Sequence, residues 1–429
     1  MTNSARRIRV AFLVFYFEAW DSLAELHRRL LDDDRFEVLT VAIPRRLTGD
    51  VAFDDASGAS AFLTEAGVAH EVWAFADEYE AGRRLREWAP DYTFLNYPWQ
   101  RNYQRGLRPD ALIEFTRIAY VPYFSLSLVL EPGPDGEFAE GVAAHYFTQR
   151  THQLASLVFV QSEEVKAAFG STSRGTDGVV VVGAPKLDAL VAEVAASAGA
   201  VAGAVAGLVG TRTRRRITWA PHHSYSPHWL NFGTFAEVRD AMLALARQHS
   251  DVEFVLRAHP FMFGTLVDRG VIAADQLDAW RAAWNALPNT TDGTEFSLAE
   301  VFDCDLLVSD GISFLAEYPL ATGRSGLFIE REGHWPFSGM GELAAQANYP
   351  ANIDTFSDAI TEFLNGSEFE PKVTEIAALR SAAMPHAGRS AALMHEALID
   401  HWATEPSLVD PTRITETAWE LLPGREPLD

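Results

Sequence analysis

Apolar and polar positions alternate along the chain with two different periods. Short apolar runs such as residues 8–17 (IRVAFLVFYF) and 36–44 (FEVLTVAIP) predict strands. Between them, residues 20–34 carry leucines three or four positions apart, which predicts an amphipathic helix. This alternation continues to about residue 190. Strands that alternate with helices are typical of a mostly parallel, doubly wound sheet, so we expect an α/β fold.

The alternation stops at residues 191–215 and then starts again. This segment is rich in Ala and Gly and ends in an arginine cluster, which we interpret as a solvated face rather than a phosphate site. Residues 216–402 alternate strands and helices once more. We therefore predict two facing Rossmann-like domains, 1–190 and 216–402, with a ligand cleft between the carboxyl ends of their sheets. The tail, 403–429, is expected to fold back on the first domain.

Length and charge limit the class of protein. At 429 residues the chain is too long for one ordinary core, which agrees with two domains. The net charge of −24 argues against a protein that coats nucleic acid or an anionic membrane, because both would repel it. We therefore expect no nucleic-acid partner and at most peripheral membrane contact. An anionic small substrate remains compatible with this charge, since a local cationic pocket can oppose it.

Cysteine content and apolar segments bear on the cellular compartment. The single cysteine, Cys304, excludes an intramolecular disulfide and a cysteine-based zinc site, and we interpret it as a buried, inert thiol. The N-terminal apolar run ends at Glu18 without a small-residue cleavage site, which favours a core strand over a signal peptide. Residues 195–210 are mostly Ala and Gly and too few to span a membrane. We expect a cytoplasmic protein.

Polar side chains of the second domain gather directly after its predicted strands. The segments are WAPHHS (219–224), RAHP (257–260) and SDGISFLAEY (309–318). Because the carboxyl ends of parallel strands meet at one edge of a sheet, the loops that follow them form the ligand site of such folds. We expect these three segments to line one pocket.

The SDGIS segment has the pattern of an anion site. Gly311 permits a tight turn from a strand into a helix, whose free N–H groups and positive dipole end attract a phosphate. Ser313 adds a hydroxyl, and Glu317, one turn further on, can hydrogen-bond ribose. Alternatively, the serine or aspartate before Gly311 only caps the helix. The candidate donor-binding residues of this segment are Ser309, Asp310, Gly311, Ile312, Ser313 and Glu317.

The other two segments contribute arginine and histidine. Arg257 and His259 lie on the same side of a strand end, where arginine binds phosphate and histidine donates to phosphate or moves a proton. Adjacent His222 and His223 point apart in an extended chain and have no Cys or acidic ligand close in sequence, which disfavours zinc. We expect one of these two to reach the ligand, with no bound metal and no cofactor. We interpret His228 as a surface residue.

Together, in this order and spacing, these segments resemble the CDP-glycerol glycerophosphotransferase family, the teichoic acid primases and polymerases. The matching residues are Trp219-Ala220-Pro221, Arg257-Ala258-His259-Pro260, Ser309-Asp310-Gly311-Ile312-Ser313 with Glu317, and Gly183, Pro185 and Asp188. The resemblance covers the second domain well and the first only in outline. It implies a GT-B fold of two Rossmann domains, a CDP-activated polyol as donor, and catalysis without a metal.

One feature of that family is missing. The resemblance implies a His-Gly pair in the first domain that supplies the base for the acceptor hydroxyl, but the corresponding residues 118–128 (IAYVPYFSLSL) contain no histidine. Glu18, Asp21 and Tyr123 are candidate substitutes in first-domain loops that face the predicted cleft. Tyr97 joins Tyr123 as a candidate residue on the acceptor side.

The resemblance implies a transferase that moves glycerol phosphate or ribitol phosphate from a CDP-activated donor to a hydroxyl of a glycan or glycan-like acceptor, releasing CMP. Two alternatives stay open. One is a GT-B glycosyltransferase that uses a nucleotide sugar in the same pocket. The other is a non-catalytic, nucleotide-binding subunit of a larger complex, which the missing His-Gly pair favours.

Overall fold

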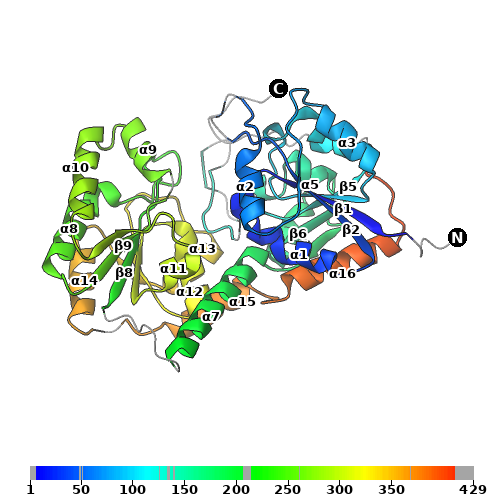
Figure 1. Cartoon of the computed structure of the whole chain (residues 1–429). Helices are drawn as coiled ribbons and strands as arrows, with labels where there is room; N and C mark the ends of the chain where they lie inside the picture. The colour runs from blue at the N-terminus through cyan, green and yellow to red at the C-terminus, as the bar shows by residue number, and fades with distance from the viewer. Residues whose placement is uncertain are drawn as a thin grey trace. The chain divides into compact units, whose positions relative to one another are not determined.

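The computed structural model describes residues 6–47, 50, 52–124, 126–132, 136–138, 141–205, 214–259, 261–367 and 369–410. The chain forms two compact units, each with one sheet (Figure 1). The N-terminal unit contains the chain up to Ser125, then Pro132–Ala189, and the chain from Ala383 onward. The C-terminal unit contains Leu126–Glu131 and Leu190–Ala382.

The sheet of the N-terminal unit has seven parallel strands in the order β3-β2-β1-β4-β5-β6-β7. The strands are β1 (Ile8–Val14), β2 (Phe36–Ala42), β3 (Glu71–Val72), β4 (Tyr92–Leu95), β5 (Arg117–Tyr120), β6 (Leu157–Val160) and β7 (Val179–Val181). The α-helices are α1 (Asp21–Leu31), α2 (Ser57–Glu65), α3 (Glu80–Trp88), α4 (Pro109–Leu112), α5 (Arg150–Leu154), α6 (Glu163–Phe169) and α16 (Ser390–Ala403). α7 (Pro185–Val205) begins in this unit and continues into the C-terminal unit, which includes the chain from Leu190.

The side chains of β1 alternate between two apolar cores. Val10, Phe12 and Val14 lie in one core, and Ala11 and Leu13 lie in the other. Successive residues of a strand point to opposite faces, and a parallel sheet is covered on both faces by its crossover helices. The nearly continuous apolar run that predicted this strand therefore reflects burial on both sides.

The sheet of the C-terminal unit has six parallel strands in the order β10-β9-β8-β11-β12-β13. The strands are β8 (Arg216–Ala220), β9 (Glu253–Leu256), β10 (Thr290–Asp292), β11 (Leu306–Ser309), β12 (Leu327–Ile329) and β13 (Tyr349–Ala351). The helices are α8 (Phe235–Gln248), α9 (Met262–Asp268), α10 (Ala274–Asn285), α11 (Leu298–Phe302), α12 (Ile312–Thr322), α13 (Gly339–Gln346), α14 (Phe356–Leu364) and α15 (Val373–Ala383).

Both units are Rossmann-like, so the predicted α/β class with two such domains is confirmed. The Trp-Ala-Pro segment contributes to the core of the second one. Trp219 is buried in β8 and stacks on Phe235 of α8, with ring centroids 5.2 Å apart. Within the described residues, no helix has both the length and the apolar character needed to cross a membrane.

The C-terminal helix α16 differs from its predicted place in the second domain (216–402). Met394 and Leu398 of α16 share a core with Leu23 and Leu26 of α1, and Figure 1 shows the two helices side by side. The Asp188 carboxylate accepts hydrogen bonds from the Ser390 hydroxyl and from two backbone N–H groups at the start of this helix. The structure therefore assigns α16 to the N-terminal unit. A helical pattern reveals an apolar face but not which sheet that face covers.

The two segments predicted as connector and tail are only partly described. α7 continues to Val205 and so occupies the first part of the predicted connector, 191–215, of which residues 206–213 lie outside the described residues. In the tail, the Pro406 carbonyl accepts a hydrogen bond of 2.9 Å from Arg117 Nε, which places this part of the tail on the N-terminal unit. Residues 411–429 lie outside the described residues.

Candidate functional site

The loops after β8, β9 and β11 meet at the carboxyl edge of the C-terminal sheet. The ring centroids of His223 and His259 are 3.7 Å apart with the ring planes inclined by 20°, and those of His222 and His259 are 5.7 Å apart. The His222 backbone N–H donates to Asp310 Oδ1 over 2.5 Å. The structure thus brings together one residue or more from each of the three segments that the sequence singled out. His228 is exposed in the same loop.

Asp310 ties two of these loops together. Its carboxylate is fully buried and accepts from the His222 N–H and from both the N–H and the hydroxyl of Thr234, at 2.6 and 2.7 Å. Burial raises the pKa of Asp310 to about 7, although these hydrogen bonds act in the opposite direction. Asp310 therefore positions the loop after β8, and its side chain does not cap α12. Ser309, the last residue of β11, is also buried.

The start of α12 lies directly against the His222 ring. A Cβ at Gly311 would come within 3.0–3.2 Å of three atoms of His222, so a side chain at this position would displace the ring. The N-cap residue of α12 is Gly311, so within the described residues no N-cap side chain hydrogen-bonds the first N–H groups of the helix. Ser313 is exposed in the first turn, and Glu317 is buried. Such a helix start can hold an anion.

The three imidazoles of this site are neutral at pH 7. Burial, together with the neighbouring imidazoles, holds the pKa of His222 well below its usual 6.5. Burial lowers the pKa of His223 to about 4 and that of His259 to about 3. These rings can therefore donate or accept hydrogen bonds but carry no charge before a ligand binds. Positive charge near these rings comes from Arg257, whose Nη1 donates to the Thr294 carbonyl, and from Arg269 near His223.

The carboxyl edge of the N-terminal sheet is aromatic. Tyr16, Tyr97 and Tyr123 follow β1, β4 and β5, with ring centroids 4.8–5.3 Å apart. Burial raises the pKa of Tyr97 and of Tyr123 well above 10. Glu18 forms an ion pair of 2.6 Å with Arg45, and its side chain remains 43% exposed. Asp21 is the first residue of α1.

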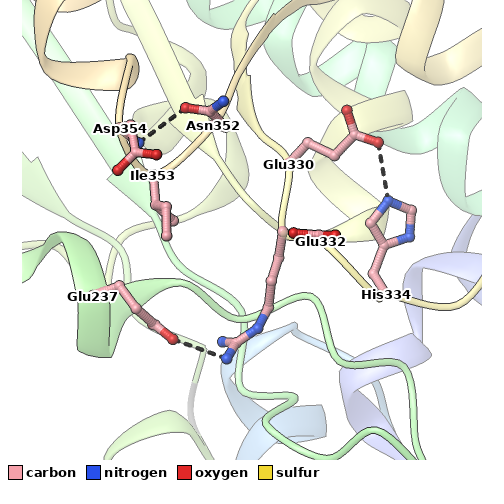
Figure 2. Close-up of a pocket in the computed structure, with 9 residues that line it drawn as sticks. Glu237, Glu330, Glu332, His334, Asn352, Ile353 and Asp354 are labelled. Carbon is pink, nitrogen blue, oxygen red and sulfur yellow. Dashed lines mark hydrogen bonds and ion pairs between the residues drawn. The ribbon is translucent and has the colours of Figure 1, made fainter.

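Sequence reasoning missed a cavity in the C-terminal unit, at the carboxyl ends of β12 and β13 (Figure 2). Its volume is about 610 Å³, and its lining residues are Glu237, Glu330, Arg331, Glu332, Gly333, His334, Asn352, Ile353 and Asp354. Arg331 pairs with Glu237 at 2.8 Å, and Glu330 lies 3.3 Å from His334 Nε2. The signal in the sequence is the apolar run Leu327–Ile329, which Glu330 and Arg331 follow directly.

This cavity and the histidine site share one loop, residues 221–234. Phe232 stacks on His334 with ring centroids 4.4 Å apart, and the Phe232 N–H donates to Ser224 Oγ. Leu230 and Asn231 have positive φ values of 58° and 59°, a conformation uncommon for residues other than glycine. The Trp335 N–H donates to the Leu230 carbonyl, and the Asn231 side-chain amide donates to the Gly333 carbonyl. These two hydrogen bonds hold the strained pair in place. Contacts from both the histidine site and this cavity therefore position the loop.

Comparisons with known proteins identify the fold. No family model matches the chain, and no curated protein matches it. Among solved structures, the chain is similar to UDP-GlcNAc 2-epimerase from Neisseria meningitidis bound to UDP-GlcNAc (TM-score 0.58, 13% identity, covering 92% of this chain and 100% of that chain). It is also similar to the wall teichoic acid polymerase TagF in a structure soaked with CDPG (0.54, 12%, 93% and 90%). These similarities show that the chain has the GT-B fold.

Proposed function

We propose that the protein is a GT-B transferase that moves a polyol phosphate from a CDP-activated donor to a hydroxyl of a glycan or glycan-like acceptor. CMP is the leaving group. The observation that carries the proposal is the convergence of the loops after β8, β9 and β11 on the uncapped start of α12. The likeness of the segments 219–221, 257–260 and 309–313 to the glycerophosphotransferases, and the fold shared with TagF, support the donor class.

In this proposal the donor diphosphate occupies the start of α12. The first N–H groups of the helix and the Ser313 hydroxyl hold its oxygens, and Arg257 supplies positive charge. Glu317 binds the ribose. As the acceptor oxygen forms its bond to the phosphorus that bears the polyol, the bond from that phosphorus to the CMP oxygen breaks. Fixed donors around the diphosphate stabilise the charge that develops on CMP.

The acceptor side is assigned to the N-terminal unit. Tyr97 and Tyr123 offer hydroxyl groups and ring faces, and Glu18 and Asp21 offer carboxylates in the loop after β1. These residue types suit a polyhydroxylated acceptor, because hydroxyls hydrogen-bond carboxylates and sugar rings pack on aromatic faces.

The released nucleotide tests the reaction. The protein is incubated with CDP-glycerol, CDP-ribitol and a panel of nucleotide sugars, each with and without glycan acceptors, and the nucleotide products are separated by chromatography. Release of CMP that depends on the acceptor supports the proposal. Release of UDP from a nucleotide sugar instead supports the second candidate, a sugar-transforming enzyme, which the fold shared with the UDP-GlcNAc 2-epimerases favours.

A further inference from the structure

The three imidazoles at the strand ends differ in what their Nδ1 atoms contact. Nδ1 of His222 accepts a hydrogen bond from the Ser224 N–H at 3.3 Å and lies 2.8 Å from Ser224 Oγ. That Oγ already accepts from the Phe232 N–H, so its own proton is available for Nδ1. Nδ1 of His259 accepts from the Phe261 N–H at 3.2 Å.

These contacts fix the tautomers of two rings. A neutral imidazole carries its proton on one nitrogen, and the hydrogen bond that the other nitrogen makes decides which one. Because Nδ1 accepts in both His222 and His259, their protons reside on Nε2. Both rings therefore present an N–H donor, and neither has a free lone pair with which to take a proton from a substrate.

His223 is different. Within the part of the chain that the structure describes, no hydrogen bond reaches its imidazole, and its Nδ1 is buried without a partner. The ring is positioned instead by its stack on His259 and by an edge contact with Trp229, at 5.1 Å between centroids. Because Nδ1 of His223 neither donates nor accepts a hydrogen bond within the described residues, no such bond favours one tautomer of this ring over the other. Nε2 of His223 can therefore carry either a lone pair or a proton.

We propose that His223 is the catalytic base of the transfer reaction, and that His222 and His259 bind the donor phosphates as fixed Nε2–H donors. This assignment rests on the proposed function. The Nε2 lone pair of His223 takes the proton of the acceptor hydroxyl while the acceptor oxygen bonds to phosphorus. The bond from phosphorus to the CMP oxygen breaks, CMP leaves with that electron pair, and His223 later passes the proton to water.

The surroundings of His223 suit this role. Burial and the nearby Arg269 lower the pKa of His223, so its lone pair is available at pH 7. The groups that face it are the neutral rings of His222 and His259 and the side chains of Trp229 and Phe261. A donor diphosphate brings negative charge to the same edge of the sheet. That charge raises the affinity of His223 for a proton at the moment when it must hold one.

Substitution by glutamine separates the two roles. The side-chain NH₂ of glutamine can replace an Nε2–H donor but cannot take up a proton at pH 7. We expect H223Q to lower kcat by about 10²- to 10⁴-fold with little change in the KM for the donor. H259Q and H222Q serve as matched variants and lower kcat/KM by no more than about tenfold, while H259A loses more. Added imidazole partly restores turnover to H223A, which a purely structural role would not allow.

Nitrogen NMR of the imidazoles tests the tautomers without any turnover. In protein labelled with ¹⁵N-histidine, long-range ¹H–¹⁵N correlations distinguish Nε2–H from Nδ1–H rings, and each single variant identifies its own signal. Nε2–H tautomers for His222 and His259 support the assignment, and an Nδ1–H tautomer for either overturns it. If the protein turns over a CDP-polyol and H223Q is as active as the unmodified protein while E18Q or D21N is inactive, His223 is not the base. If the unmodified protein releases no nucleotide from any donor, the proposed function itself fails, whatever the tautomers are.

Discussion

The carboxyl edges of the two sheets have the same topology but different chemistry. In the N-terminal unit, tyrosines from three loops pack on one another and close the edge with ring contacts. In the C-terminal unit, imidazoles, a buried carboxylate and an uncapped helix start occupy the same position. Parallel topology supplies a site at each edge, and the side chains decide what it can bind. An edge with a helix start that lacks an N-cap side chain suits an anion, whereas an aromatic edge suits rings and hydroxyls.

The largest expected effect is at Arg257, in the loop after β9. We predict that Arg257→Ala lowers turnover by about 10³- to 10⁵-fold, because it removes fixed positive charge beside the transferred phosphoryl group. Steady-state kinetics measure this loss, and circular dichroism checks the fold. Arg247→Ala, at an exposed position of α8, is the control and retains full turnover. Equal losses in both variants would contradict a local role for Arg257.

A second comparison concerns two carboxylates that each accept three hydrogen bonds, Asp310 and Asp188. Asp310 is fully buried, whereas Asp188 is half-buried. We predict that Asp310→Asn lowers the free energy of unfolding by about 1–3 kcal/mol, because the amide NH₂ faces buried donors. Asp188→Asn costs less, since water can reach its partners. Urea unfolding measures both, and hydrogen exchange of residues 221–234 should rise only in Asp310→Asn.

The pH dependence of stability tests the neutral histidine cluster. The folded-state pKa values of His223 and His259 lie near 4 and 3, below about 6.5 in the unfolded chain. At a pH between the folded-state and unfolded-state pKa values, the unfolded chain binds more protons than the folded protein does. The contribution of the neutral rings to the stability of the folded protein is therefore complete above pH 6.5 and is lost as the pH falls towards 4. Each ring contributes up to about 1.4 kcal/mol per pH unit there.

Replacing both rings should therefore make the free energy of unfolding depend less steeply on pH below 6.5. We expect the H223Q/H259Q double variant to lose less unfolding free energy between pH 6.5 and 4 than the unmodified protein does. Urea unfolding at several pH values measures this slope. His228→Gln, at an exposed position, should leave the slope unchanged. A double variant with an unaltered slope would mean that the two rings bind protons as readily in the folded protein as in the unfolded chain.

The smallest expected effect is on the aromatic edge. If the Tyr123 hydroxyl contacts the acceptor, Tyr123→Phe raises the KM for the acceptor by about tenfold, the value of one hydrogen bond, and leaves nucleotide affinity unchanged. Tyr103→Phe is the matched control, because the Tyr103 hydroxyl donates to the Tyr97 carbonyl at 2.9 Å and is buried. It should lower the unfolding temperature without changing this KM. The opposite pattern would place the acceptor elsewhere.

The central strands and the edge strand β7 could be predicted from sequence, and the other three edge strands could not. β3, β10 and β13 each contain two or three residues and lie at the edges of their sheets. An edge strand is paired and covered on fewer sides, so it lacks the long apolar run that marked β1. The place of α16 was also hidden, since its partner lies more than 350 residues earlier in the chain.

The candidate site shows the same division between local and distant information. The strand-exit segments could be found because a topological rule places such loops together. The roles within them could not, because they depend on contacts distant in sequence. Asp310 resembled a helix cap, yet its carboxylate accepts from Thr234, 76 residues away. The difference between His222 and His223 depends on the Ser224 hydroxyl and on the stack with His259, neither of which a sequence pattern reveals.

Calorimetric titration with CDP, CMP, UDP and GDP tests most directly whether the C-terminal edge is a site for a cytidine nucleotide. We predict saturable heat with CDP, weaker binding of CMP because it lacks one phosphate, and a clear preference for CDP over UDP and GDP. Arg257→Ala should lose most of the CDP affinity while keeping its fold. Equal heats with all nucleotides, or no binding of CDP to the unmodified protein, would contradict the donor assignment.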